Sequence, residues 1–99
     1  MSQPAIALHD SIEIADHVVF RELDGETVLL NLQTGTYFGL DKVGTTIWTL
    51  LRDHGSLEVV LERMLATYDA ARDTIQADLL RLVGELSSQG LARVKHPEA

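Results

Sequence analysis

The spacing of apolar residues changes abruptly near Asp41, and this change constrains the fold more than any other feature of the sequence. Before Asp41, apolar and polar residues alternate with the period of a strand. After Asp41, apolar residues recur three and four positions apart, which is typical of an amphipathic helix. Strands followed by helices cannot form the alternating units of a parallel sheet. The sequence therefore predicts an α+β fold of winged helix-turn-helix-like type, with helices covering one sheet face.

Three strands in a meander are expected in the first half of the chain, at residues 17–23, 26–32 and 36–40. They are rich in β-branched, aromatic and leucine residues. Asp24-Gly25 between the first two is the strongest short signal for a two-residue hairpin turn. Residues 11–14 also alternate, and they either extend the first strand or pair separately.

Three helices are expected in the second half. The first is expected to begin at an Asp41 N-cap and end at Gly55. The second begins at Ser56, and its apolar stripe runs to Tyr68 before a connection at 69–72. The third begins at an Asp73/Gln76 capping box and ends at Gly90. The first helix has an apolar face of Val43, Ile47, Leu50 and Leu51. Trp48 lies at the boundary of this face, and we expect it to be partly buried.

One domain is expected over residues 11–94, because 99 residues with 45% apolar content suffice for one modest core. Residues 1–10 and 95–99 lack a clear period and are expected to be flexible. The first residues lack the basic region of a secretory signal, and no stretch approaches the ~20 apolar residues of a membrane span. Because the chain has no cysteine, a reducing cytoplasm is the expected compartment.

No arrangement of side chains in the sequence predicts catalysis, a cofactor or a metal ion. The four histidines, at positions 9, 17, 54 and 96, lack the spacing that places two ligands on one helix face. No Gly-x-Ser-x-Gly elbow surrounds a serine, and there is no glycine-rich phosphate loop. We therefore expect a protein that is not an enzyme and that needs neither cofactor nor metal.

Charge disfavours nucleic acids and anionic membranes as partners. The net charge is −7, and a polyanion repels such a chain. Winged helices often bind DNA, but the third helix, which would enter the groove, combines two basic with three acidic residues. These are Arg72 and Arg81 against Asp73, Asp78 and Glu85. A helix that reads DNA needs the opposite balance.

A peptide is the partner that the residues favour. The third strand, 36–40, contains no proline and no charged residue that would protect its free backbone groups. Either a guest strand adds to this edge or another part of the chain covers it. Phe38 and Leu40 are expected to face the core, with Tyr37 and Gly39 on the opposite side.

The third helix adds a second indication of peptide binding. Its expected apolar stripe consists of Ile75, Leu79, Leu82 and Leu86. Leu80 and Val83 flank this stripe. We expect Leu80, Val83 and Gln76 to line a shallow groove beside the core.

The run VLLNLQTGTYFGLDKVGTTIWTLL, from Val28 to Leu51, resembles the PqqD-like family of leader-recognition elements in ribosomal peptide modification pathways. Tyr68, Asp78, Leu82-Val83 and Gly90-Leu91 are similar to later positions of the family, so the resemblance covers residues 15–94. It implies that the leader of a precursor peptide adds as a strand to the third strand and rests against the third helix. The peptide-binding residues that it implies are Thr36, Tyr37, Phe38, Gly39, Leu40, Asp78, Leu79, Leu80, Leu82 and Val83.

The resulting hypothesis is a non-catalytic adaptor that binds a leader peptide and presents it to a modifying enzyme. The stand-alone form is similar to lasso-peptide pathway members, which implies a peptidase and a cyclase as partners. An acidic winged-helix domain for regulation or protein interaction is the main alternative, and a peptide-independent subunit of a larger enzyme is a third. The sequence leaves open which residues of the third strand donate hydrogen bonds to the guest.

Overall fold

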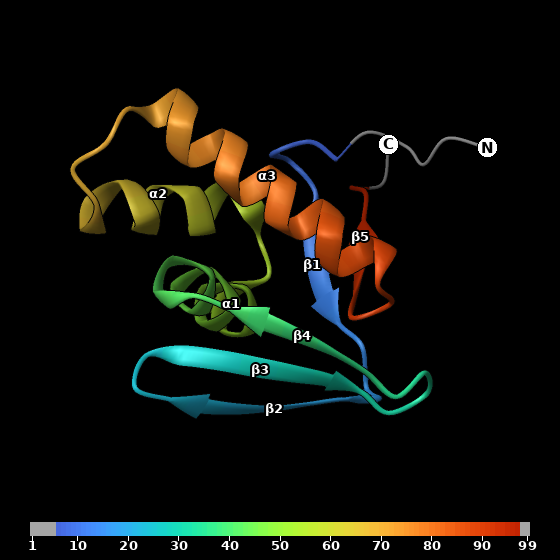
Figure 1. The fold of residues 1–99 in the computed structure, drawn as a ribbon. Coiled ribbons are helices and arrows are strands. Elements are labelled where there is room, and N and C mark those ends of the chain that lie inside the picture. The colour runs from blue at the N-terminus through green and yellow to red at the C-terminus, as the bar shows by residue number, and fades with distance from the viewer. Residues whose placement is uncertain (1–5, 98–99) are drawn as a thin grey trace.

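The computed structural model describes residues 6–97 of the chain. The elements follow the order β1 (Ser11–Ile14), β2 (Val18–Leu23), β3 (Glu26–Asn31), β4 (Thr36–Leu40), α1 (Lys42–His54), α2 (Leu57–Thr67), α3 (Arg72–Ser88) and β5 (Ala92–Lys95). Strands β2, β3 and β4 form one antiparallel sheet in that order, and all three helices lie on one side of it (Figure 1). The predicted α+β class is confirmed, and the arrangement is consistent with a winged helix-turn-helix-like fold.

The β2–β3 hairpin closes with the predicted two-residue turn. Asp24 and Gly25 both have positive φ, at 55° and 81°, as a turn that matches the twist of the strands requires. The second turn uses Gly35 at a φ of 75°. On β3, Leu29 is fully buried toward α1, while Val28 on the opposite face is 49% exposed.

Strand β1 pairs separately from the meander, and its partner β5 was not predicted from the sequence. The two are antiparallel, with Ile12 opposite Val94. Strand β5 follows the end of α3, where Leu91 donates its backbone N–H to the Leu86 carbonyl at 2.9 Å. This bond is the Schellman-type ending that Gly90-Leu91 predicts, and it turns the chain back toward β1.

The segment before β1 contacts the rest of the protein. The buried Asp10 carboxylate accepts hydrogen bonds from the Ala7 N–H and, at 2.9 Å, from His96. These two contacts lower the pKa of the Asp10 carboxyl. Residues 1–5 and 98–99 lie outside the described residues, so flexible ends and a domain boundary at 11–94 stay predictions.

The first two helices have the predicted caps, whereas the third does not. Asp41 accepts a hydrogen bond from the Gly44 N–H at 2.8 Å, and Ser56 accepts one from Val59. The N-cap of α3 is Ala71, which makes no side-chain cap. The predicted Asp73/Gln76 capping box is therefore wrong. Because the helix begins at Arg72, Asp73 lies inside the first turn. There its negative charge interacts favourably with the positive end of the helix dipole.

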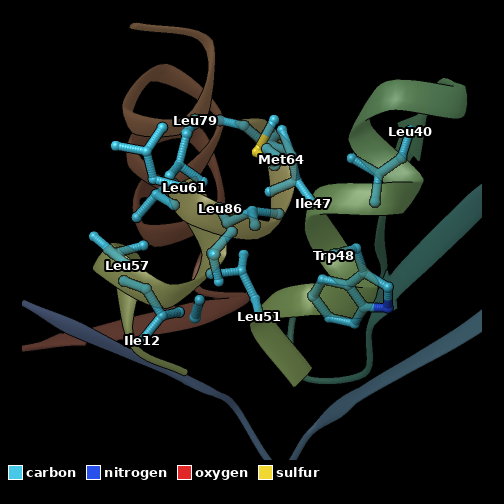
Figure 2. Close-up of a cluster of buried hydrophobic side chains, with 14 of the residues drawn as sticks. Ile12, Leu40, Ile47, Trp48, Leu51, Leu57, Leu61, Met64, Leu79 and Leu86 are labelled. Carbon is cyan, nitrogen blue, oxygen red and sulfur yellow. The ribbon is translucent and has the colours of Figure 1, made fainter. Parts of the chain in front are cut away.

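The core fills the space between the sheet and the helices (Figure 2). Trp48 is more deeply buried than the sequence predicted, with only 1% of its surface exposed. The rings of Trp48 and Phe20 of β2 form a T-shaped pair, with 5.8 Å between their centroids. The guanidinium carbon of Arg52 lies over the Phe20 ring, 4.2 Å from its centroid. The Trp48 Nε1 has no hydrogen-bond partner among residues 6–97. Trp48 thus joins α1 to the sheet by packing alone.

Replacement of Trp48 by alanine is expected to lower the free energy of unfolding by about 3–5 kcal/mol, because the change leaves a cavity between α1 and the sheet. Urea unfolding followed by circular dichroism measures this loss. Trp48→Phe is the control, since it keeps most of the ring and removes the unpartnered N–H. A loss below about 1 kcal/mol for Trp48→Ala would contradict the central position of this ring.

Candidate peptide-binding groove and sheet edge

The turn between β2 and β3 determines where the backbone groups of the whole sheet point. A two-residue hairpin closes on a hydrogen-bonded pair, here Leu23 and Glu26. Hydrogen-bonded and non-hydrogen-bonded pairs alternate along an antiparallel ladder. Alternate residues of β3 from Glu26 onward therefore bond to β2. The intervening ones, Thr27, Leu29 and Asn31, direct their N–H and C=O groups toward β4.

Strand β4 has a free edge with outward-pointing backbone groups. The register partners of Thr27, Leu29 and Asn31 are Leu40, Phe38 and Thr36, so these three residues of β4 bond to β3. The N–H and C=O groups of Tyr37 and Gly39 point away from β3. Within residues 6–97 no strand pairs with this side of β4. Such an edge accepts an additional strand through main-chain hydrogen bonds.

A groove of about 400 Å³ runs beside this edge, between β4, α1 and α3. Its lining comprises Phe38, Gly39, Leu40, Asp41, Val43, Gly44, Ile47, Asp78, Arg81, Leu82 and Glu85. The floor is apolar, because Leu40, Ile47 and Leu82 are at least 93% buried there. A strand added to β4 would place alternate side chains over this floor.

Charged side chains from α3 form one wall of the groove. Arg81 donates to the Glu85 carboxylate at 2.7 Å, and both side chains are partly exposed. Asp78 is half-buried and forms no ion pair among the described residues. At the end of β4, one carboxylate oxygen of Asp41 is occupied by the Gly44 N–H. The wall is therefore mostly acidic, with polar groups available to an extended peptide.

The structure brings some of the sequence-predicted site residues together and separates others. Phe38, Gly39, Leu40, Asp78 and Leu82 line the groove, and Thr36 and Tyr37 continue the same strand. Leu79 and Val83 are fully buried in the core, and Leu80 is partly buried against it. The expected groove beside Leu80 and Val83 is therefore wrong in its position.

The helix presents its opposite flank to the groove. On a helical wheel, Asp78 and Glu85 lie on one side of Leu82, whereas Leu80 and Val83 lie on the other. The N-terminal segment reaches this flank, because Ile6 lies next to Gly84. Sequence reasoning took this segment as an end without contacts, so it left that flank open.

The residues predicted to bind the peptide did not include six that line the groove: Asp41, Val43, Gly44, Ile47, Arg81 and Glu85. Val43 was placed on the core face of α1, yet it is 40% exposed. Arg81 and Glu85 have the appearance of an ordinary solvated face. Only the α1 residues carried a signal in the sequence, because the first turn of α1 directly follows β4 and must lie beside its edge.

Gly39 has no role within the free chain that requires a glycine. Its φ is not in the left-handed region, and a Cβ atom built there would meet nothing within 4 Å. Glycine inside a strand weakens it, and often marks the close approach of another backbone or a ligand. Gly39 lies at the open edge, where a guest strand would approach.

We expect Gly39→Ala to raise the free energy of unfolding by roughly 0.5–1 kcal/mol while weakening the binding of an added peptide strand. Thermal unfolding gives the first quantity, and fluorescence polarisation with a labelled peptide gives the second. Gly35→Ala is the opposite control: its positive φ disfavours alanine, so it should destabilise the turn. If Gly39→Ala were destabilising, the strand itself would need the glycine.

Two further features bear on what the groove can do. Among residues 6–97, no group of three or more His, Asp or Glu side chains is arranged to hold a metal ion. No described helix has the length and hydropathy that crossing a membrane requires.

The sequence and fold are similar to known leader-binding proteins. Residues 26–92 match the family described as Coenzyme PQQ synthesis protein D (PqqD). The structure of TbiB1 in complex with the TbiA(beta) leader peptide matches with a TM-score of 0.78 and 42% identity, covering 82% of this chain and 94% of TbiB1. A lasso peptide synthetase B1 complexed with the leader peptide matches with a TM-score of 0.75 and 24% identity, covering 84% and 98%, which supports the fold alone. No curated protein matches the chain significantly.

Proposed function

The chain belongs to the PqqD family, and from this premise we propose that it is an adaptor, without catalytic activity of its own, that binds the leader of a precursor peptide. The adaptor presents the precursor to the enzymes that modify or cut it, in a pathway of the lasso-peptide type. The observation that carries the proposal is the free edge of β4 beside an apolar groove, in a chain that is 42% identical to a protein seen with a leader peptide.

The proposed binding mode follows from the direction of the backbone groups. The leader pairs with the outward N–H and C=O groups of Tyr37 and Gly39 and continues the sheet as a fourth strand. Alternate leader side chains enter the groove and pack on Leu40, Ile47 and Leu82. Main-chain pairing contributes affinity for many sequences, and the apolar pocket selects a leader with a bulky apolar residue at that register.

The acidic wall refines the choice of leader. Of the two α3 carboxylates in the wall, Glu85 is paired with Arg81, whereas Asp78 has no ion-pair partner among the described residues. A leader with a basic or neutral polar residue beside the groove is compatible with this wall. A leader with an acidic residue there is repelled.

Regulation through DNA binding is the alternative that the winged-helix arrangement suggests. The net charge of −7 and the mixed charges of α3 disfavour it. A gel-shift assay with generic duplex DNA at physiological salt is expected to show no binding. Sub-micromolar, salt-sensitive binding would favour the regulatory function instead.

Fluorescence polarisation tests the proposed function directly. The probe is a fluorescein-labelled leader of the precursor encoded beside this chain, and the labelled TbiA(beta) leader is a heterologous comparison. Saturable binding that an unlabelled leader displaces, and a scrambled leader of equal composition does not, is expected. If the chain binds neither leader, the adaptor function is wrong.

A further inference from the structure

Strand β5 has a free edge of its own, separate from that of β4. It lies beside β1 and the C-terminal end of α3 (Figure 1). It pairs with β1 on one side, and among residues 6–97 no strand pairs with its other side. An edge of this kind accepts an extended peptide through main-chain hydrogen bonds.

The hydrogen bonds of β1 determine which backbone groups of β5 point to this edge. Ile12 donates its N–H to the Gly55 carbonyl at 2.9 Å, so its backbone groups point away from its register partner Val94. Because hydrogen-bonded pairs alternate along an antiparallel ladder, the neighbouring pair of Glu13 and Arg93 is the hydrogen-bonded one. The N–H and C=O groups of Val94 therefore point away from β1, toward the free edge.

A hollow of about 910 Å³ lies against β5. Its lining includes Arg93 and Val94 of β5, Ser87 near the end of α3, and Gln33 in the turn before β4. These residues come from three separate segments, and the hollow between them is open to solvent. A guest strand on β5 therefore has room for its side chains.

The charges beside this edge are mainly positive, unlike those of the groove. The Glu13 carboxylate is shared by two cations, Arg93 at 2.9 Å and Lys95 at 3.1 Å, so one positive charge is not neutralised there. Among the described residues that line the hollow, Asp16 is the only carboxylate. An acidic guest side chain on this face of β5 is favoured. A second copy of β5 is not, because it would bring like charges together.

The hollow lies where a leader would leave β4. Antiparallel pairing is the more stable orientation, and a leader bound in this way runs from Leu40 toward Thr36. Beyond Thr36 it reaches the turn before β4, where Gln33 lines the hollow. The groove extends along α3 to Glu85, and the hollow includes Ser87 of the same helix. The next part of the precursor therefore reaches β5 without a long linker.

We infer that the free edge of β5 and the adjoining hollow bind a second, acidic segment of the same precursor, C-terminal to the segment that pairs with β4; this inference rests on the proposed function. The second segment pairs with the outward groups of Val94, and its acidic side chain lies beside Arg93 and Lys95. Once the first segment is bound, the second contact forms at a high effective concentration.

Fluorescence polarisation with a nested set of precursor fragments tests this inference. The probes are the labelled full precursor encoded beside this chain and N-terminal fragments of it, down to the shortest that still binds. Val94→Pro removes an N–H that points away from β1. Glu22→Pro is the matched control, because it removes an outward N–H at the free edge of β2.

The parent is expected to bind the full precursor at least about fivefold more tightly than the shortest fragment, because the second contact adds to the first. Val94→Pro is expected to bind the shortest fragment within about twofold of the parent and to lose the gain from the full precursor. Glu22→Pro should keep both. A precursor whose acidic residues are replaced by their amides should lose the same gain.

The inference is wrong if the parent binds the full precursor no more tightly than the shortest fragment, or if Val94→Pro keeps the gain. If Val94→Pro keeps the gain but lowers the unfolding temperature as much as deletion of residues 2–5 does, the occupant is the N-terminal end of the chain itself. A parent dimer that Val94→Pro dissociates in light scattering also contradicts the inference, since β5 then pairs with a second copy. If Val94→Pro does not fold, the charge reversal Lys95→Glu replaces it and should lose the gain.

The two proposals fail in different ways. No binding of any fragment by the parent contradicts the proposed function. Normal binding of the shortest fragment, without a gain from the full precursor, contradicts only the second site on β5.

Discussion

Val83→Asp is expected to unfold the protein. Val83 is fully buried on α3, and no cationic side chain is buried beside it among the core residues. A carboxylate there loses its hydration without gaining a partner, which costs more than about 4 kcal/mol. Since a domain of this size has a total stability of about 5–15 kcal/mol, circular dichroism should show a largely unfolded or strongly destabilised chain at 25 °C.

Val43→Asp is the matched comparison, because it makes the same change at the groove. Val43 is 40% exposed at the start of α1, so its aspartate remains hydrated and close to the positive end of the helix. We expect a folded variant whose leader binding is weakened several-fold. A folded Val83→Asp with impaired leader binding would instead place Val83 in the groove and contradict the described packing of α3.

The contrast between these two valines shows what the sequence can and cannot predict about the site. Both belong to apolar patterns with helical period, and the period predicted the helices and most of their buried stripes. It did not predict which flank of a stripe another segment covers. Ile6 lies next to Gly84 on that side of α3, and it comes from a segment without any periodic signal. Contacts between distant, irregular segments leave no pattern in a single sequence.

Strand β5 was missed for a related reason. Four residues after a helix end are too few to show alternation, and their pairing with β1 depends on a partner about eighty positions away. The α3 flank was misplaced because charged residues are normally solvent-exposed, so Arg81 and Glu85 gave no sign of a groove wall. By contrast, the Asp24-Gly25 turn was predictable. Together with the β3–β4 register that the structure shows, it determines which β4 residues have free backbone groups.

Tyr37→Pro is expected to abolish leader binding while leaving the fold largely intact. The Tyr37 N–H points to the open edge of β4, so proline removes a donor that the free chain does not use. The sequence alone could not distinguish Tyr37 from Phe38 in this respect. Phe38 bonds to Leu29 of β3, and its side chain packs against the core, so Phe38→Pro should destabilise the sheet. Thermal unfolding and fluorescence polarisation with the labelled leader separate the two effects.

Two controls isolate the backbone donor from other consequences of the change. Tyr37→Thr removes the ring but keeps both the N–H and a high strand propensity, so it should bind the leader within a few-fold of the parent. Glu22→Pro places proline at an outward-pointing N–H of β2, the opposite edge of the sheet, and should not affect leader binding. Proline at either edge has a similar effect on the strand itself. Loss of leader binding with Tyr37→Pro but not with Glu22→Pro therefore shows that the leader pairs with β4. Equal loss with Glu22→Pro would place the leader on β2. Unchanged binding with both would contradict strand addition to this sheet.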